Sequence, residues 1–299
     1  MFKGQIAKLL VGVMVLSTLG TVPTYADAKQ PYIALGADLN ASERQTVLEL
    51  LDITEVDLDN YQVDTVTNAE EHEYLGGYLS SDIIGSRALS SVKVEEKGDG
   101  KGIKVTTKNI SYCTTGMYQN SLATAGVKDA DVVVAGPYNI SGTAALVGTI
   151  KAYNTMTGEV LKPDNVEAAT NELVVTSQLG ESIGDKEKAE QLIGAVKDVI
   201  VAEEISDPVE IGQAIDETAA KLNISLSEAE KQQIADLMSK ISALDLDVDA
   251  LKEQVNGLYD KLKGLGVDLS SGEKEVEGFF VSLGQWFSDK WATIKQYFQ

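Results

Sequence analysis

The stretch with the greatest potential for chemistry is VVVAGPYNISGTAALVG, from Val132 to Gly148. It passes from a β-branched apolar run through glycines and a serine into small residues. Two functional loops have this general form: a glycine-rich loop that binds phosphates through backbone amides, and a sharp strand-to-helix turn that exposes a nucleophilic serine. The third interpretation is a structural junction between a strand and a helix.

Neither chemical motif fits the spacing. A phosphate loop needs a lysine after its second glycine, but Gly136 and Gly142 are separated by five residues and Thr143 stands where the lysine belongs. A nucleophile turn needs glycines two residues before and after its serine, and Asn139 and Thr143 occupy those positions around Ser141. We therefore predict no catalytic, cofactor-binding or metal-binding residues. Gly136, Asn139, Ser141, Gly142 and Thr143 form the candidate ligand loop, because a helix N-terminus beside them could hold an anion.

The structural interpretation makes specific predictions about the same segment. A strand should end at Ala135, a Gly-Pro turn should follow, and Ser141 should be the N-cap of a helix that runs to about Tyr153. Ala145, Gly148 and Ala152 would form a small-residue face on this helix, which allows close backbone packing.

His72 is the one histidine of the chain, in the helical pattern NAEEHEYLGGYL. A single histidine excludes a two-histidine metal motif. A Ser-His-Asp arrangement with Ser141 or Ser86 stays formally open, but the spacing does not support it. We expect His72 to be a solvated residue beside its glutamates.

The segment DLDVDALKEQVN, from Asp245, begins like a calcium-binding loop. Such a loop needs glycine at its sixth position and glutamate at its twelfth, where this chain has Ala250 and Asn256. An acidic helix entrance is the preferred interpretation.

The secondary-structure elements that must position these residues change along the chain from mixed strands and helices to helices alone. Short runs such as YQVDTVT, SSVKVEE, GIKVTT and DVVVAG predict strands, and helical patterns lie near 69–79 and 114–125. After about Pro163 only helical patterns remain. We predict an α+β protein with a mixed α/β domain over 27–160 and a helical domain over 161–299.

Three segments share one capping pattern, in which Asn40, Ser227 and Ser270 are each followed three residues later by glutamate. This spacing is typical of a capping box at a helix start. The first two copies continue similarly, with ITEVDLD and ISALDLD, so an internal duplication stays open. Recurring capping chemistry is the simpler explanation.

The N-terminus predicts export. Lys3 and Lys8 are followed by the apolar run LLVGVMVLSTLG and the small-residue segment PTYADA, as in a secretory signal peptide cleaved after Ala26. The apolar run is too short for an ordinary membrane span, and we predict none in the mature chain. The lone Cys113 excludes an internal disulfide, so the fold must depend on its apolar core.

The charge and the aromatic residues of the chain indicate which classes of partner it can bind. The formal net charge is −21, and removal of the two signal-peptide lysines would make it about −23. Such an acidic chain should repel nucleic-acid phosphates. The C-terminal segment EVEGFFVSLGQWFSDKWATIKQYFQ predicts a helix with a broad aromatic face. We expect this helix to pack on the preceding helices, and any surplus apolar edge could contact a partner or a membrane surface.

Several segments together resemble the YpuA-like secreted proteins of Gram-positive bacteria: LGADLNASERQ, NAEEHEYLGGYL, ALSSVKV, SLATAGVKDADVVVAGPYNISGTAALVG and DVDALKEQVNGLYDKLKGLGVDL. Residues 120–148 are the most specific part. The resemblance implies an exported or cell-wall-associated protein and a domain of unknown function, and it implies no catalytic residues.

Two functions follow as hypotheses. The first is a non-catalytic module that binds an envelope component or another protein outside the cytoplasmic membrane. The alternative is an envelope hydrolase with its site in the loop from Gly136 to Thr143. Binding is favoured because no nucleophile, metal cluster or paired-acid spacing is recognisable, although carboxylates from distant segments could still meet in space.

Overall fold

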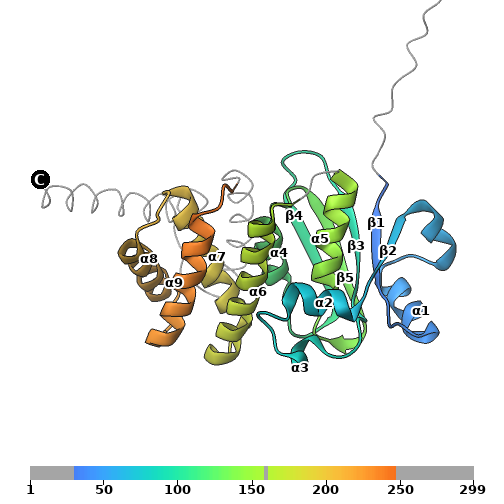
Figure 1. The fold of residues 1–299 in the computed structure, drawn as a ribbon, viewed down its shortest axis with the longest axis horizontal. Coiled ribbons are helices and arrows are strands. Elements are labelled where there is room, and N and C mark those ends of the chain that lie inside the picture. Colours follow the sequence, from blue (N-terminus) through green and yellow to red (C-terminus); the bar gives the residue numbers. More distant parts are fainter. Residues whose placement is uncertain (1–29, 158–160, 247–299) are drawn as a thin grey trace, which may run out of the picture.

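The computed structural model describes residues 30–157 and 161–246 of the chain. Five strands in this part form one mixed sheet in the order β2-β1-β3-β5-β4 (Figure 1). β1 is parallel to β2 and β5 is parallel to β4, while β3 joins the two pairs in antiparallel orientation. The strands are β1 (Tyr32–Gly36), β2 (Gln62–Val66), β3 (Ser91–Glu96), β4 (Ile103–Ile110) and β5 (Ala130–Ile140).

Helices cover both faces of this sheet. Alternate residues of β1 point to opposite faces: Ile33 and Leu35 pack with α1 (Ala41–Leu50), and Ala34 packs with α5 (Thr143–Thr157). The face toward α5 also receives α2 (Asn68–Leu75) and α4 (Thr115–Ala125). A short 3₁₀ helix, η1 (Glu55–Asn60), leads from α1 into β2, and α3 (Ser81–Ile84) follows α2. Because both faces are covered, every residue of β1 is buried.

The predicted small-residue face of α5 is confirmed. Ala145 and Ala152 are buried, and a Cβ added at Gly148 would lie 2.8 Å from Ala34 Cβ and 3.0 Å from Val92 Cγ1. The backbone of α5 therefore lies directly against β1 and β3, as close packing of small residues allows.

The end of β5 differs from the prediction. The strand does not end at Ala135 but continues through Pro137 to Ile140. Its pairing with β4 jumps from Lys108↔Ala135 to Ile110↔Ile140, so four β5 residues lie opposite one β4 residue. Pro137 can be accommodated because β3 no longer pairs beyond Ala135. The predicted Gly-Pro turn is thus a bulge within a strand, a feature that commonly re-aims side chains next to sites.

After the sheet the described chain is helical, as predicted, and the α+β class is confirmed. The helices are α6 (Pro163–Ile183), α7 (Lys186–Ala202), α8 (Pro208–Lys221) and α9 (Glu228–Ser242). α6 contributes Leu173 to the core beside the sheet and Leu179 to the core of the helical part. Because α6 belongs to both cores, the division at residue 160 stays a prediction.

Buried polar groups join the sheet layer to the helical part. The Lys197 ammonium on α7 donates to Glu172 Oε1 on α6 at 2.9 Å, to Asn120 O on α4 at 2.9 Å and to Thr124 Oγ1 at 3.2 Å. The Thr124 hydroxyl donates to the other oxygen of Glu172. The side chains of Lys197 and Glu172 are at most 1% exposed. All three protons of the ammonium therefore have acceptors without water.

Two of the three predicted capping boxes are confirmed, at Asn40 for α1 and Ser227 for α9. Ser270 lies outside the described residues. Ile53 follows the end of α1, whereas its counterpart Ile241 lies within α9. The two segments thus form different structures, which favours recurrent capping over duplication.

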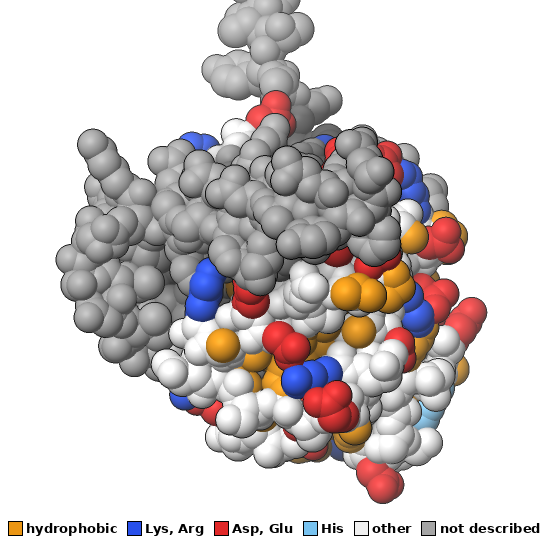
Figure 2. Space-filling model, turned by 90° about the vertical axis from the view of Figure 1, so that its left-hand side faces the viewer, with side chains coloured by type: hydrophobic (Ala, Val, Ile, Leu, Met, Phe, Trp, Pro, Cys, Tyr) orange, Lys and Arg blue, Asp and Glu red, His pale blue; other side chains and the backbone are white. Residues whose placement is uncertain are grey.

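Figure 2 shows the end of the molecule with α8 and α9, where acidic and basic side chains are interspersed around hydrophobic ones. None of the helices in residues 30–157 and 161–246 combines the length and the apolar composition that a membrane span requires. The predicted signal peptide, most of the calcium-like segment and the aromatic C-terminal helix lie outside the described residues.

Candidate functional site

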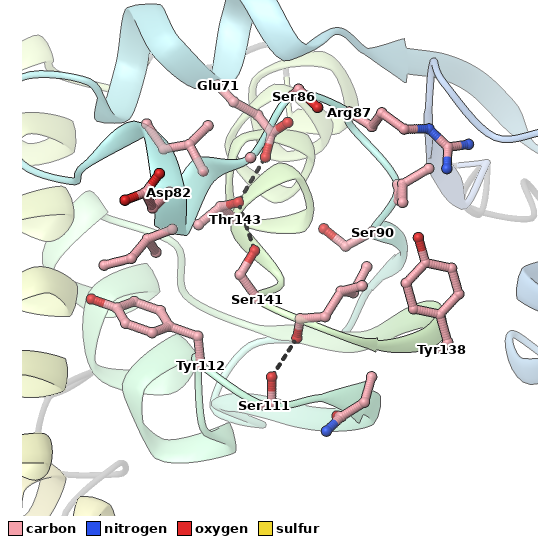
Figure 3. Close-up of a pocket in the computed structure, with 16 residues that line it drawn as sticks. Glu71, Asp82, Ser86, Arg87, Ser90, Ser111, Tyr112, Tyr138, Ser141 and Thr143 are labelled. Atoms are coloured by element: carbon pink, nitrogen blue, oxygen red, sulfur yellow. Dashed lines mark hydrogen bonds between the residues drawn. The ribbon is translucent and has the colours of Figure 1, made fainter.

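A pocket of about 470 Å³ opens at one edge of the sheet. The carboxyl ends of the parallel strands β4 and β5 meet there with the beginning of the antiparallel β3. Ligands of α/β sheets characteristically bind outside the carboxyl ends of strands. Figure 3 shows the lining, which is rich in hydroxyl groups. It consists of Glu71, Asp82, Ile83, Ile84, Gly85, Ser86, Arg87, Leu89, Ser90, Ser111, Tyr112, Tyr138, Asn139, Ile140, Ser141 and Thr143.

The candidate ligand loop lies at this pocket. Asn139, Ser141 and Thr143 line it directly. Gly136 and Gly142 shape the backbone instead. Gly136 O accepts a hydrogen bond from Asn109 Nδ2 at 3.2 Å in the bulge of β5. Gly142 has a φ of 98°, and an added Cβ would lie 2.6 Å from Tyr118 Oη. Glycine is therefore required at position 142 for both conformation and space.

A series of hydrogen bonds leads from the pocket into the interior. Ser141 Oγ lies 3.2 Å from Thr143 Oγ1, and the Thr143 hydroxyl donates to Glu71 Oε1 at 2.7 Å (Figure 3). Glu71 Oε2 accepts from Asn68 Nδ2 at 3.3 Å. Glu71 is 1% exposed, and its burial raises the pKa of the carboxyl group above the usual range. Both carboxyl oxygens already have donors from the protein, which indicates a supporting position beneath the pocket.

The raised pKa of Glu71 predicts a pH effect on stability. Between the ordinary carboxyl pKa of 4.5 and the higher native value, the folded state binds more protons than the unfolded state. The contribution of Glu71 to stability should therefore decline as pH rises through this interval. Urea unfolding at pH 4.5 to 8 should show wild type losing free energy of unfolding relative to Glu71→Gln. A constant difference between the two proteins across that range would contradict the prediction.

The start of α5 corrects another prediction. The helix begins at Thr143, so Gly142 and not Ser141 occupies the N-cap position. The early helix amide of Ala145 donates to Ser90 Oγ at 3.0 Å, and Ser90 comes from the segment before β3. The Ser141 hydroxyl contacts Thr143 Oγ1. A distant serine thus caps the helix, which frees Ser141 to line the pocket.

We expect Ser90→Ala to lower the free energy of unfolding by about 1 kcal/mol, the usual effect of a lost cap, because the Ala145 amide loses its acceptor in a buried place. Ser141→Ala is the matched control and should change stability by less than about 0.5 kcal/mol. Urea denaturation of both variants measures the difference. A larger loss for Ser141→Ala than for Ser90→Ala would restore Ser141 as the cap.

Arg87 lies at the pocket, but its guanidinium group is already paired with other groups of the protein. Its guanidinium donates to both oxygens of Glu43, at 3.0 and 2.6 Å, and to Asp38 O at 2.7 Å. The hydrogen bond from Arg87 holds the pKa of Glu43 below its usual range. Paired in this bidentate geometry, Arg87 brings little free positive charge to the pocket.

His72 does not line the pocket. The residue is half-buried, and its Nε2 lies 3.3 Å from Gly85 O. The expectation of a solvated histidine is therefore wrong in part. Ser141 and an acid meet at the pocket without the histidine that a Ser-His-acid mechanism requires.

Cys113 follows β4 and is buried, and burial raises the pKa of its thiol to about 12. Such a thiol is unreactive near neutral pH. In the described ranges no group of three or more His, Cys, Asp or Glu side chains is placed to hold a metal ion.

Sequence reasoning missed Glu71 and Ser90. The signal for Glu71 was its position four residues before Leu75, which places both side chains on one helical face, and Leu75 is fully buried. Ser90 carried no comparable signal, because its role depends on the packing of β3 beside α5.

Fold and site together define an α+β protein with a polar pocket at the carboxyl edge of a mixed sheet. The chain belongs to the family described as proteins of unknown function (DUF1002), whose model matches residues 35–258.

A relative in Bacillus subtilis (strain 168), described as the uncharacterized protein YpuA, is 44% identical over 216 residues. The alignment covers 72% of this chain and 73% of the relative. The family resemblance seen in the sequence is thereby confirmed. No solved structure matches significantly.

Proposed function

We propose that this protein is exported and acts as a non-catalytic binding protein of the cell envelope, with the pocket at the β4–β5 edge as its ligand site. The pocket carries the proposal, because one loop from the bulge of β5 to the start of α5 contributes much of its lining. Small-molecule sites of proteins are concave, and a small number of placed polar groups in them fix the orientation of the ligand.

Two features of the bulge support binding. Tyr138 and Asn139 lie in the bulge and are exposed at the pocket, Tyr138 to 49%. Pro137 beside them has a fixed φ, and the hydrogen bond from Asn109 Nδ2 to Gly136 O, at 3.2 Å, holds the bulge that presents these side chains. A rigid site of this kind loses little conformational entropy when a ligand binds.

Cell-wall binding tests the proposed function. The chain from residue 27 is mixed with isolated walls of Bacillus subtilis and sedimented. We expect wild type to sediment with the walls and the double variant Tyr138→Ala, Asn139→Ala to lose about nine-tenths of that binding. Tyr74→Ala is the matched control, because Tyr74 is 37% exposed on α2 and does not line the pocket. Equal sedimentation of all three proteins, or of none, would refute the proposal.

Export has its own test. N-terminal sequencing should show that the protein recovered outside the membrane begins at Asp27, as expected for cleavage after Ala26. The second expected cleavage site is after Ala28, which would give a protein that begins at Lys29. Recovery of extracellular protein that begins at Met1 would contradict signal-peptide cleavage.

A second candidate function, an envelope hydrolase, is favoured by one observation. Ser141 is connected through Thr143 to the buried acid Glu71. A carboxyl group with a raised pKa can accept or supply a proton during hydrolysis. Release of soluble fragments from walls, abolished by Glu71→Gln in a folded protein, would establish this alternative over binding.

A further inference from the structure

We propose that the pocket takes an uncharged saccharide, which stacks on Tyr138 and accepts and donates hydrogen bonds at Asn139 and the Ser86 hydroxyl. This inference rests on the proposed function and names the class of its ligand.

The charges at the pocket argue against an ionic ligand. Arg87 is paired with Glu43 and offers no strong anion site. Glu71 is enclosed beneath Thr143. Asp82, on α3, is the remaining acid of the lining, and it is exposed, where solvent weakens a charge-charge attraction. The acidic chain as a whole further disfavours anions.

The groups that remain available match a sugar. The exposed Ser86 hydroxyl can both donate and accept, and the Asn139 amide can do so through its two ends. Within the described residues the Asn139 side chain has no hydrogen bond to the protein, so it is available to a ligand. Ser86 is likewise exposed at the pocket.

Tyr138 supplies an apolar surface for the C–H groups of a sugar. The residue is 49% exposed beside the polar lining, and Figure 3 shows it on the side of the pocket opposite Asp82. An exposed aromatic face can cover the C–H face of a pyranose ring, while the hydroxyls at the ring edge reach polar partners. Polar groups of fixed orientation then select among hydroxylated ligands.

Isothermal titration with oligosaccharides of matched length tests the inference. The uncharged probes are chitotetraose, cellotetraose and maltotetraose, the cationic probe is the fully deacetylated chitotetraose, and the anionic probe is tetragalacturonic acid. We expect an uncharged probe to bind wild type more tightly than either charged probe. Tyr138→Ala and Asn139→Ala should each weaken binding about tenfold, equivalent to about 1.4 kcal/mol. Tyr74→Ala should bind like wild type.

Preference for a charged probe, binding unchanged in both pocket variants, or no binding of any uncharged probe would each overturn the saccharide inference. Thermal melting of Tyr138→Ala, Asn139→Ala and Tyr74→Ala checks that these variants are folded. The two proposals fail separately: if walls bind through Tyr138 and Asn139 but no uncharged saccharide does, the pocket remains the binding site and its ligand belongs to another class.

Discussion

Replacement of Lys197 by methionine should lower the free energy of unfolding by about 3–5 kcal/mol, because removal of one partner leaves the Glu172 carboxylate buried without its cation. The ammonium also donates to Asn120 O and Thr124 Oγ1, so these groups lose a donor in the same change. Urea denaturation followed by circular dichroism measures the effect.

The matched control is Lys240→Met. Lys240 pairs with Glu167 at 3.4 Å, but both side chains are about half exposed, and such surface pairs contribute about 0–1 kcal/mol. The double variant Lys197→Met, Glu172→Leu should recover much of the lost stability, because it removes both buried charges. Similar losses for Lys197→Met and Lys240→Met would show that the buried pair does not hold the sheet layer to the helical part.

The second large effect is expected at Gly148. Gly148→Ala places a methyl group 2.8 Å from Ala34 Cβ, and such overpacking costs about 1–3 kcal/mol. Gly212→Ala is the control, because Gly212 also lies within a helix but an added Cβ there has nothing within 4 Å. That variant should gain about 0.5–1 kcal/mol from helix propensity. Thermal melting that shows equal stabilisation by the two substitutions would contradict the close packing of α5 on the sheet.

The sequence was most informative where a local pattern decides the structure. The capping boxes at Asn40 and Ser227 depend on residues three positions apart, and both form. The small-residue face of α5 follows from helical periodicity alone, and Gly148 occupies it as expected. β1 was not predicted, because its five buried residues show no alternation of apolar and polar side chains.

The site was harder to predict because distant segments build it. The loop from Gly136 to Thr143 contributes Asn139, Ser141 and Thr143 to the pocket, and its role as a ligand loop stays a prediction. The role of Ser141 was wrong, because the cap of α5 comes from Ser90, fifty-five positions before the amide that it accepts. No local pattern records such a partner. Glu71 was recognisable as part of a buried helical face, but its contact with Thr143 required the fold.

Amide NMR of the isotope-labelled chain from residue 27, with and without muramidase-solubilised cell-wall fragments, tests the central claim that the pocket is the ligand site. We expect shift changes to concentrate at residues 138–143 and 82–90, which meet at the pocket edge, and Tyr138→Ala to suppress them. Shift changes confined to other surfaces, such as α8 and α9, or a spectrum unaltered by the fragments, would contradict it.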